Sequence, residues 1–149
     1  MTHRAEQILT AATTAVTGLA STGSAVVRGR LYPTDDSPAL SVFMGADAVQ
    51  GDYGYSNMAY VDRLLDLIIR IHAKGLTDDA AIDTLLNASR AEVFAAIATD
   101  PTLGLGFVIS AYPAGDEAPV LDVSSDQPTG MQDMHFSVHY RHSTTSAEA

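Results

Sequence analysis

The sequence lacks cysteine and tryptophan and contains a single lysine, Lys74, in 149 residues. Without cysteine there is no thiolate nucleophile, no cysteine-ligated zinc site and no disulfide framework. The scarcity of lysine is part of a wider imbalance of 18 acidic against 8 basic residues, a formal net charge of -10. Binding to a nucleic-acid backbone needs clustered lysine and arginine, so this charge argues against a nucleic-acid reader.

Long apolar runs are missing as well. The N-terminal residues carry Glu6 and lead into an Ala/Thr-rich segment, without the unbroken apolar stretch of a secretory signal. The longest apolar region, residues 61–71, is interrupted by four charged residues and is too short to span a bilayer. With 46% hydrophobic residues, the chain is expected to be one soluble domain made in cytosol-like water, with no membrane partner.

Hydrophobic spacing predicts a helix at the start of the chain, with Gly18 as its left-handed C-terminal cap. Its apolar face consists of Ala5, Ile8, Leu9, Ala12, Val16 and Leu19. Two strands are expected next, Ser24–Tyr32 and Ala39–Met44, separated by the turn-forming residues 35–38. Residues 45–57 contain three glycines and two aspartates without any period, which predicts a long exposed loop. Such a loop either serves an interaction or is a turn without a role.

Residues 61–72 fit a helix or a strand. A strand places Leu65, Leu67, Ile69 and Ile71 on one face, and we prefer this interpretation. A second helix is expected from an N-cap at Thr77 to Asp100-Pro101, with the apolar positions Ile82, Leu85, Leu86, Val93 and Ile97.

Three more strands are predicted in residues 103–112, 120–123 and 134–140, followed by a flexible tail over 143–149. This order of elements predicts an α+β fold. A single domain over residues 1–142 would have a mixed or antiparallel sheet with two helices on one face.

Five histidines raise the hypothesis of a metal site. His135 and His139 are four residues apart in a predicted strand, about 13 Å along it, which is too far to share one ion. Histidines on a solvent-facing strand surface are therefore the expected arrangement, and no metal is predicted.

Catalytic and cofactor motifs are not evident. The glycine pairs at 51–54 and 104–106 lack the third glycine and the flanking strand and helix of a dinucleotide loop. The adjacent carboxylates at 35–36 and 78–79 are explained by turn and helix-cap chemistry, and no serine has a nucleophile signature. We therefore expect a protein that acts by binding, without a cofactor.

Three segments near the start of the chain carry a family resemblance. They are Arg4-Ala-Glu-Gln-Ile-Leu9, Val27-Arg-Gly-Arg-Leu-Tyr-Pro33 and Pro38-Ala-Leu-Ser-Val-Phe43. With Ile69-Arg-Ile-His-Ala-Lys-Gly75, Asp100-Pro-Thr-Leu-Gly104 and Met134-His-Phe-Ser-Val-His-Tyr-Arg141, they cover nearly the whole chain. This pattern of hydrophobic and turn residues resembles the tail terminator (tail completion) proteins of bacteriophages with long non-contractile tails.

The resemblance implies a non-catalytic virion protein that is assembled in the host cytoplasm. It implies a hexameric ring on the last ring of the tail tube, at the tail–neck junction. There it would stop tube polymerisation and present a surface to the head-completion proteins. Its partners would be copies of itself, the major tail tube protein and a neck protein, with DNA passing through the ring without specific binding. A ring uses heterologous contacts, in which two different surfaces of the subunit meet.

Charge is distributed unevenly along the chain. Residues 1–30 carry three arginines and one glutamate, net +2, whereas residues 91–149 carry one arginine and eight acids, net -7. Acids of the second group or of residues 45–57 are expected to line the bore, where they would repel DNA phosphates. The residues predicted at subunit or tube contacts are Arg28, Arg30, Asp52, Tyr53 and Tyr55. Equally, the two arginines would merely solvate an edge strand. Charge reversal at both, followed by sizing and a tail-length assay, separates these two roles.

Two other functions remain open from the sequence. A head-closure or neck adaptor would share the acidity and the ring but attach on the portal side. A small enzyme or ligand-binding domain would have a deep pocket lined by His72, His135 or His139.

Overall fold

The computed structural model describes residues 2–29, 37–50, 60–74, 79–122 and 128–146. Within them the chain forms two helices and a six-stranded mixed sheet, which confirms the expected α+β fold. The elements are α1 (Arg4–Ala15), β1 (Val26–Arg28), β2 (Ala39–Val49), β3 (Tyr60–Lys74), α2 (Asp79–Thr99), β4 (Val108–Asp116), β5 (Val120–Asp122) and β6 (Thr129–Ser143). The sheet order is β1-β2-β3-β6-β4, and β5 also pairs with β6.

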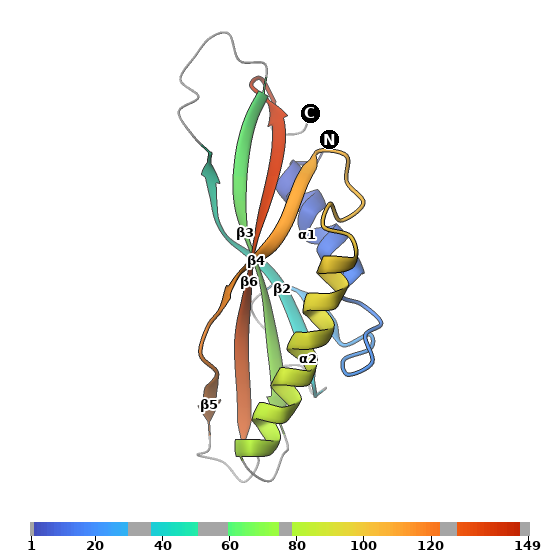
Figure 1. Ribbon diagram of the computed structural model, residues 1–149, viewed down its shortest axis with the longest axis vertical. Coiled ribbons are helices and arrows are strands. Elements are labelled where there is room, and N and C mark those ends of the chain that lie inside the picture. Colours follow the sequence, from blue (N-terminus) through green and yellow to red (C-terminus); the bar gives the residue numbers. More distant parts are fainter. Residues whose placement is uncertain (1, 30–36, 51–59, 75–78, 123–127, 147–149) are drawn as a thin grey trace.

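Two long antiparallel strands, β3 and β6, form the centre of the sheet (Figure 1). Their register is unbroken over fifteen residues, from Tyr60 opposite Ser143 to Lys74 opposite Thr129. At about 3.3 Å per residue this ladder is about 50 Å long. The strand preferred for residues 61–72 is thereby confirmed, because only an extended chain places Leu65, Leu67, Ile69 and Ile71 together on one buried face.

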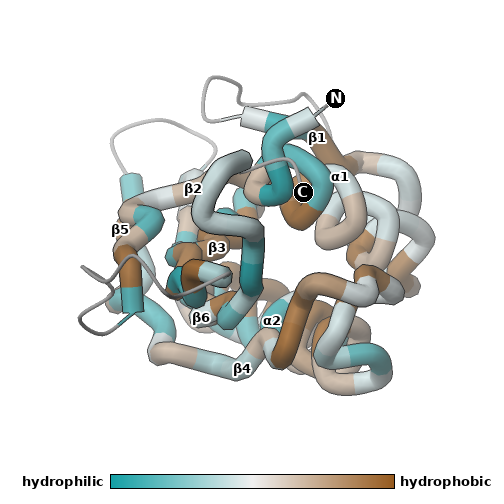
Figure 2. The backbone as a smooth tube through the Cα atoms, turned by 90° about the horizontal axis from the view of Figure 1, so that it is seen from above, coloured by the Kyte–Doolittle hydropathy of each residue, from teal (hydrophilic) through white to brown (hydrophobic). Residues whose placement is uncertain are grey.

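Both helices pack on the same side of the sheet, as predicted (Figure 1). Figure 2, viewed along the long axis, shows the helices to one side of β3 and β6 and shows β5 on the other side. The core between the layers joins one face of each helix to alternate residues of β3 and β6. Its fully buried large side chains include Ile8, Leu65, Leu67, Ile69, Ile71, Ile82, Leu86, Ile97, Phe136 and Tyr140. Burial of this apolar area provides the main stabilisation of the fold.

The expected loop at residues 45–57 is wrong in its first part. β2 continues to Val49, with a bulge between Met44 and Asp47. After the bulge, Asp47 lies on the helix-covered face, where its Oδ2 accepts a 2.6 Å hydrogen bond from the Tyr140 hydroxyl. Burial of the Tyr140 ring, together with this contact, raises the pKa of the hydroxyl above its usual range. Residues 51–57 of the expected loop lie outside the described residues.

Two elements in the first third of the chain are shorter than predicted. The opening helix ends at Ala15, and Gly18 lies in the following turn with a φ of +88°. The first strand stops at Arg28, because Gly29 has a φ of +104°, which an extended ladder does not accommodate. The remainder of that expected strand, residues 30–32, is not among the described residues.

The strand predicted at residues 103–112 begins later, at Val108, and ends later, at Asp116. A turn occupies the earlier residues because Leu103 and Gly104 both have positive φ, 54° and 70°. Asp100 fixes the start of this turn, since its Oδ1 accepts hydrogen bonds from the backbone and the hydroxyl of Thr102. The predicted second helix and the strand near residue 120 are confirmed.

The last described residues belong partly to the sheet. Ser143 ends β6, and its Oγ accepts a 3.0 Å hydrogen bond from the amide of Ser146 in a tight turn. Neither helix in the described ranges combines the length and apolarity needed to cross a membrane.

Candidate interaction surfaces

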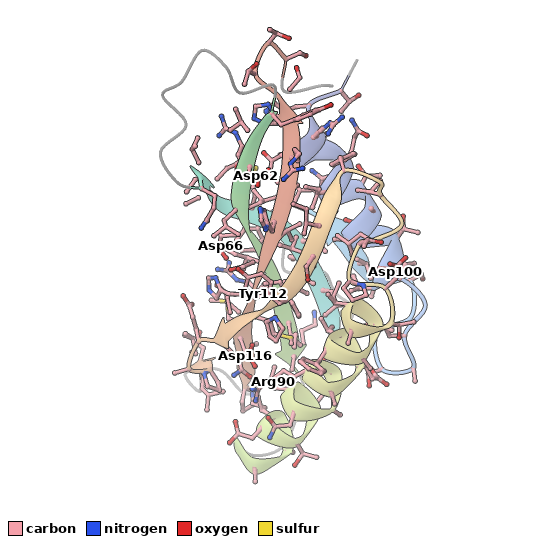
Figure 3. All side chains as sticks on the ribbon, turned by 45° about the horizontal axis from the view of Figure 1, so that its top comes forward. Asp62, Asp66, Arg90, Asp100, Tyr112 and Asp116 are labelled. Atoms are coloured by element: carbon pink, nitrogen blue, oxygen red, sulfur yellow. The ribbon has the colours of Figure 1, made fainter. Side chains whose placement is uncertain are left out.

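The face of β3 and β6 opposite the helices carries a ladder of charged side chains, which we call the open face. Strand alternation dictates its membership, because even-numbered residues of β3 pair with odd-numbered residues of β6. It consists of Asp62, Leu64, Asp66, Ile68, Arg70 and His72 of β3 and Met131, Asp133, His135, Ser137, His139 and Arg141 of β6. Figure 3 shows Asp62 and Asp66 one after the other along β3.

At one end of the open face, Asp62 binds two cationic or protonatable groups. Its carboxylate accepts hydrogen bonds from Arg141, with Nε at 2.6 Å and Nη2 at 3.2 Å, and lies 3.4 Å from Nε2 of His139. The Arg141 hydrogen bonds outweigh partial burial and hold the pKa of Asp62 below its usual range. Asp62 is therefore charged at neutral pH, although only 16% of its side chain is exposed.

In the middle of the open face, His135 lies between two carboxylates. Its Nδ1 is 2.9 Å from Oδ1 of Asp66, and its Nε2 is 3.2 Å from Oε1 of Glu117, which follows β4. Burial of the ring disfavours protonation, but the contacts with Asp66 and Glu117 prevail and raise the pKa of His135. Gly45 leaves room for this arrangement, because a Cβ there would lie 2.6 Å from Oδ2 of Asp66.

At the other end of the face, Arg70 forms a bidentate ion pair with Asp133, with N–O distances of 2.6 and 2.9 Å. Its guanidinium also covers the ring of Phe43, 5.0 Å from the centroid. Next to it, Nε2 of His72 is 3.0 Å from the hydroxyl oxygen of the buried Ser41. Burial and the positive charge of Arg70 together lower the pKa of His72.

The open face consequently carries internally paired polar side chains, interrupted by apolar residues such as the buried Ile68. Cross-strand pairs of opposite charge fix the side chains in one arrangement, which reduces the entropy lost when a partner binds. His135 and His139 lie on the face opposite the helices, as expected, but their side chains are only 21% and 28% exposed, and each contacts a carboxylate of β3. Within the described ranges, no group of three or more histidines and acids is placed to hold a metal ion.

We expect His135 and His72 to affect stability in opposite directions with pH. The pKa of His135 is raised by folding, so its contribution is complete below the unfolded pKa of 6.5 and is lost as the pH rises through the folded pKa. The pKa of His72 is lowered, so its contribution is present above 6.5 and is lost as the pH falls toward its folded pKa.

His135→Gln should therefore cost more stability at a pH of about 5.5 than at about 9, measured as the free energy of urea unfolding. His72→Gln is the matched variant, and its cost should be larger at the higher pH. An equal cost of His135→Gln at both values would contradict the raised pKa.

Of the five residues predicted at contacts, the described part of the chain contains one, Arg28. It lies at the end of β1, an edge strand, and reaches α1 instead of standing free. Its guanidinium forms hydrogen bonds of 3.0 and 3.2 Å with the carboxylate of Glu6 and contacts the hydroxyl of Thr10 at 3.4 Å. Arg28 thus fastens β1 to the helix. The other predicted contact residues, Arg30, Asp52, Tyr53 and Tyr55, lie outside the described residues.

A groove at the end of the molecule near the N-terminus was not predicted. It has a volume of about 490 Å³ and is lined by Arg4, Tyr60, Gly106, Phe107, Ile109 and Arg141, which we call the end groove. Four separate chain segments contribute to it, so no spacing in the sequence could have revealed it. Its two arginines and two aromatic rings are the residue types enriched at protein interfaces.

A second, smaller hollow of about 280 Å³ lies between α2 and β4. Figure 3 shows two of its residues, Arg90 and Asp116, next to one another, and they form an ion pair there. The exposed ring of Phe94 is also part of its lining. A ligand-binding domain was expected to have a deep pocket lined by His72, His135 or His139. Neither of these two hollows is lined by any of the three histidines.

Comparisons with known proteins give one result of note. No family model matches the chain, and no curated protein matches it. Among solved structures, it is similar to a chain in the virion of a native gene transfer agent particle, with 12% sequence identity and a TM-score of 0.48. The alignment covers 80% of this chain and 81% of that one. At this identity and TM-score, the likeness assigns neither a family nor a function.

Proposed function

We propose that the protein is a structural subunit of a phage-type virion that caps the tail tube as a ring and stops tube polymerisation. It would act by stoichiometric binding, without catalysis or a cofactor, and would present a surface to head-completion proteins. This proposal gives the subunit a place at the tail–neck junction, after assembly in the host cytoplasm. The family resemblance of the six sequence segments supports it.

The structural observation that carries the proposal is the open face. It extends along most of the β3–β6 ladder and carries cross-strand ion pairs on the sheet. A substrate pocket is concave and mostly apolar, whereas this surface is extended and polar. A rigid polar face suits repeated contacts or the lining of a hydrated channel. Asp133 lies on it and Glu117 contacts it through His135, both from the acidic C-terminal half, but each is paired with a basic side chain, Arg70 or His135.

The test is to add the purified protein to growing tubes of the major tail tube protein of the same virion, and to measure tube length by negative-stain microscopy. We expect shorter tubes that carry a ring at one end. Unchanged tube lengths at saturating protein would refute tail capping. Attachment to the portal complex with unchanged tubes would instead indicate a neck adaptor.

A further inference from the structure

The end groove presents exposed apolar and aromatic side chains. Tyr60 is 57% exposed and Ile109 is 46% exposed, although both are large hydrophobic residues. They line the groove together with Phe107. Exposed apolar residues gathered in a hollow mark a binding surface more often than isolated ones do.

The groove also carries a positive charge from Arg4, whereas the charge of its second arginine, Arg141, is balanced by Asp62. The guanidinium of Arg4 lies over the ring of Phe107, 4.5 Å from the centroid, and its Nη1 donates a hydrogen bond to the backbone carbonyl of Arg141. Among the described residues, no carboxylate lies within ion-pair distance of Arg4. Arg141 covers the ring of Tyr60 at 5.8 Å. The groove therefore favours a ligand with a carboxylate next to apolar groups.

The opposite end of the molecule offers such a ligand. Residues 115–122, which we call the acidic edge, contain Asp116, Glu117 and Asp122 and no basic residue. Val120 and Leu121 within it are 59% and 36% exposed, and the Glu117 side chain is 61% exposed. Asp116 is paired with Arg90, but Glu117, although it contacts His135, is exposed enough to meet a second cation. The edge thus combines exposed apolar side chains with the carboxylate of Glu117, which complements Arg4 of the end groove.

The two surfaces cannot meet within one subunit. β5 of the acidic edge pairs with Thr129–Met131 of β6, whereas Arg141 of the groove is ten residues further along the same strand. Ten residues of strand span about 33 Å. Figure 1 shows β5 near one end of the long axis and the C-terminal end of β6 near the other. A contact between groove and edge must therefore join two copies of the chain.

We propose that the end groove of one copy binds the acidic edge of the next. Val120, on the same face of the sheet as Glu117, would cover Tyr60 and Ile109, and the Glu117 carboxylate would reach Arg4. Two different surfaces meet in this contact, so it is heterologous and repeats from copy to copy until rotation closes a ring. The inference rests on the proposed function, because it names the self-contact of the proposed ring.

Two variants with opposite defects test the contact. The groove variant carries Arg4→Glu and Ile109→Ser, and glutamate at the first position of α1 remains compatible with the helix dipole. The edge variant carries Glu117→Gln and Val120→Ser, which add no new charge. Phe94→Ser, an equally exposed apolar site on α2, is the control. Circular dichroism and thermal unfolding confirm that every variant is folded.

We expect the wild type and the control to sediment as a ring in analytical ultracentrifugation. Each variant alone should sediment as a monomer, since removal of two anchors weakens such a contact about 100-fold or more. An equimolar mixture of the two variants should give a dimer and nothing larger, because one intact groove and one intact edge remain. This dimer distinguishes a heterologous contact from a general loss of association.

Three results would overturn the inference: a monomeric wild type, variants that still form rings, or a mixture that remains monomeric. The tube-length assay on the same proteins separates this failure from that of the proposed function. Rings that persist in both variants while tubes are capped would leave the tail role intact. The expected sedimentation pattern without any capping by the wild type would instead refute the tail role alone.

Discussion

Replacing Phe136 with alanine is expected to lower the free energy of unfolding by about 3–5 kcal/mol. Phe136 is 1% exposed and lies on the helix-covered face of β6, opposite Leu67 of β3 and Pro113 of β4. Three strands and the helix layer surround it, so the protein cannot collapse around the cavity that the missing ring would leave. A loss of this size is a large fraction of the total stability of an ordinary domain.

Tyr112→Ala is the matched control for this prediction. Tyr112 is an aromatic residue of β4 opposite Ser137, one position from Phe136 in the sheet, but it is 43% exposed (Figure 3). Its replacement should cost less than about 1 kcal/mol. Urea unfolding followed by circular dichroism measures both variants. Equal losses would mean that the core is not where the structure places it.

Replacing Gly130 with alanine is the second large effect, expected at about 1–3 kcal/mol from overpacking. A Cβ at this position would lie 2.6 Å from Cγ2 of Ile82 and 2.9 Å from Cδ2 of Leu121. The glycine therefore allows the N-terminal half of α2 to approach β6 closely. The main chain of the strand and the packed helix leave little freedom to relieve the clash.

Gly106→Ala is the control, because a Cβ there meets no atom within 4 Å. A double-mutant cycle with Ile82→Ala tests the cause, since truncating Ile82 removes the clashing methyl group. The cost of Gly130→Ala should fall in that background. If it stays the same, contact with Ile82 is not the reason for the loss. Thermal unfolding of the four proteins provides the comparison.

Elements whose apolar residues recur with one clear spacing were predictable from the sequence. The alternation of Leu65, Leu67, Ile69 and Ile71 identified β3, and the helical spacing from Ile82 to Ile97 identified α2. The errors lie where a local conformation interrupts the pattern. A bulge carried β2 through Gly45, and positive φ angles at Gly29 and Leu103 moved the ends of two strands. No periodicity records such single-residue events.

Of the candidate surfaces, the sequence predicted only that the polar residues of β6 alternate onto one face of the strand. It indicated that His135 and His139 share the face opposite the helices, but it did not indicate their partners Asp66 and Asp62, 69 and 77 residues earlier. Arg28 was predicted at a contact, yet its pairing with Glu6 depends on α1 packing against β1. Side-chain pairs between distant segments depend on register, and register is set by the whole sheet.

The sequence by itself determined the fold class, the acidic balance, the absence of thiol chemistry and the face of each long element that is buried. These properties follow from the amino-acid composition of the chain and from the hydrophobic periodicity within single segments. Only the tertiary structure decided that Arg4, Tyr60, Phe107 and Arg141 form one groove and that the acidic edge lies at the other end of β6. The physical reason is that packing of strands and helices joins residues that no local spacing connects.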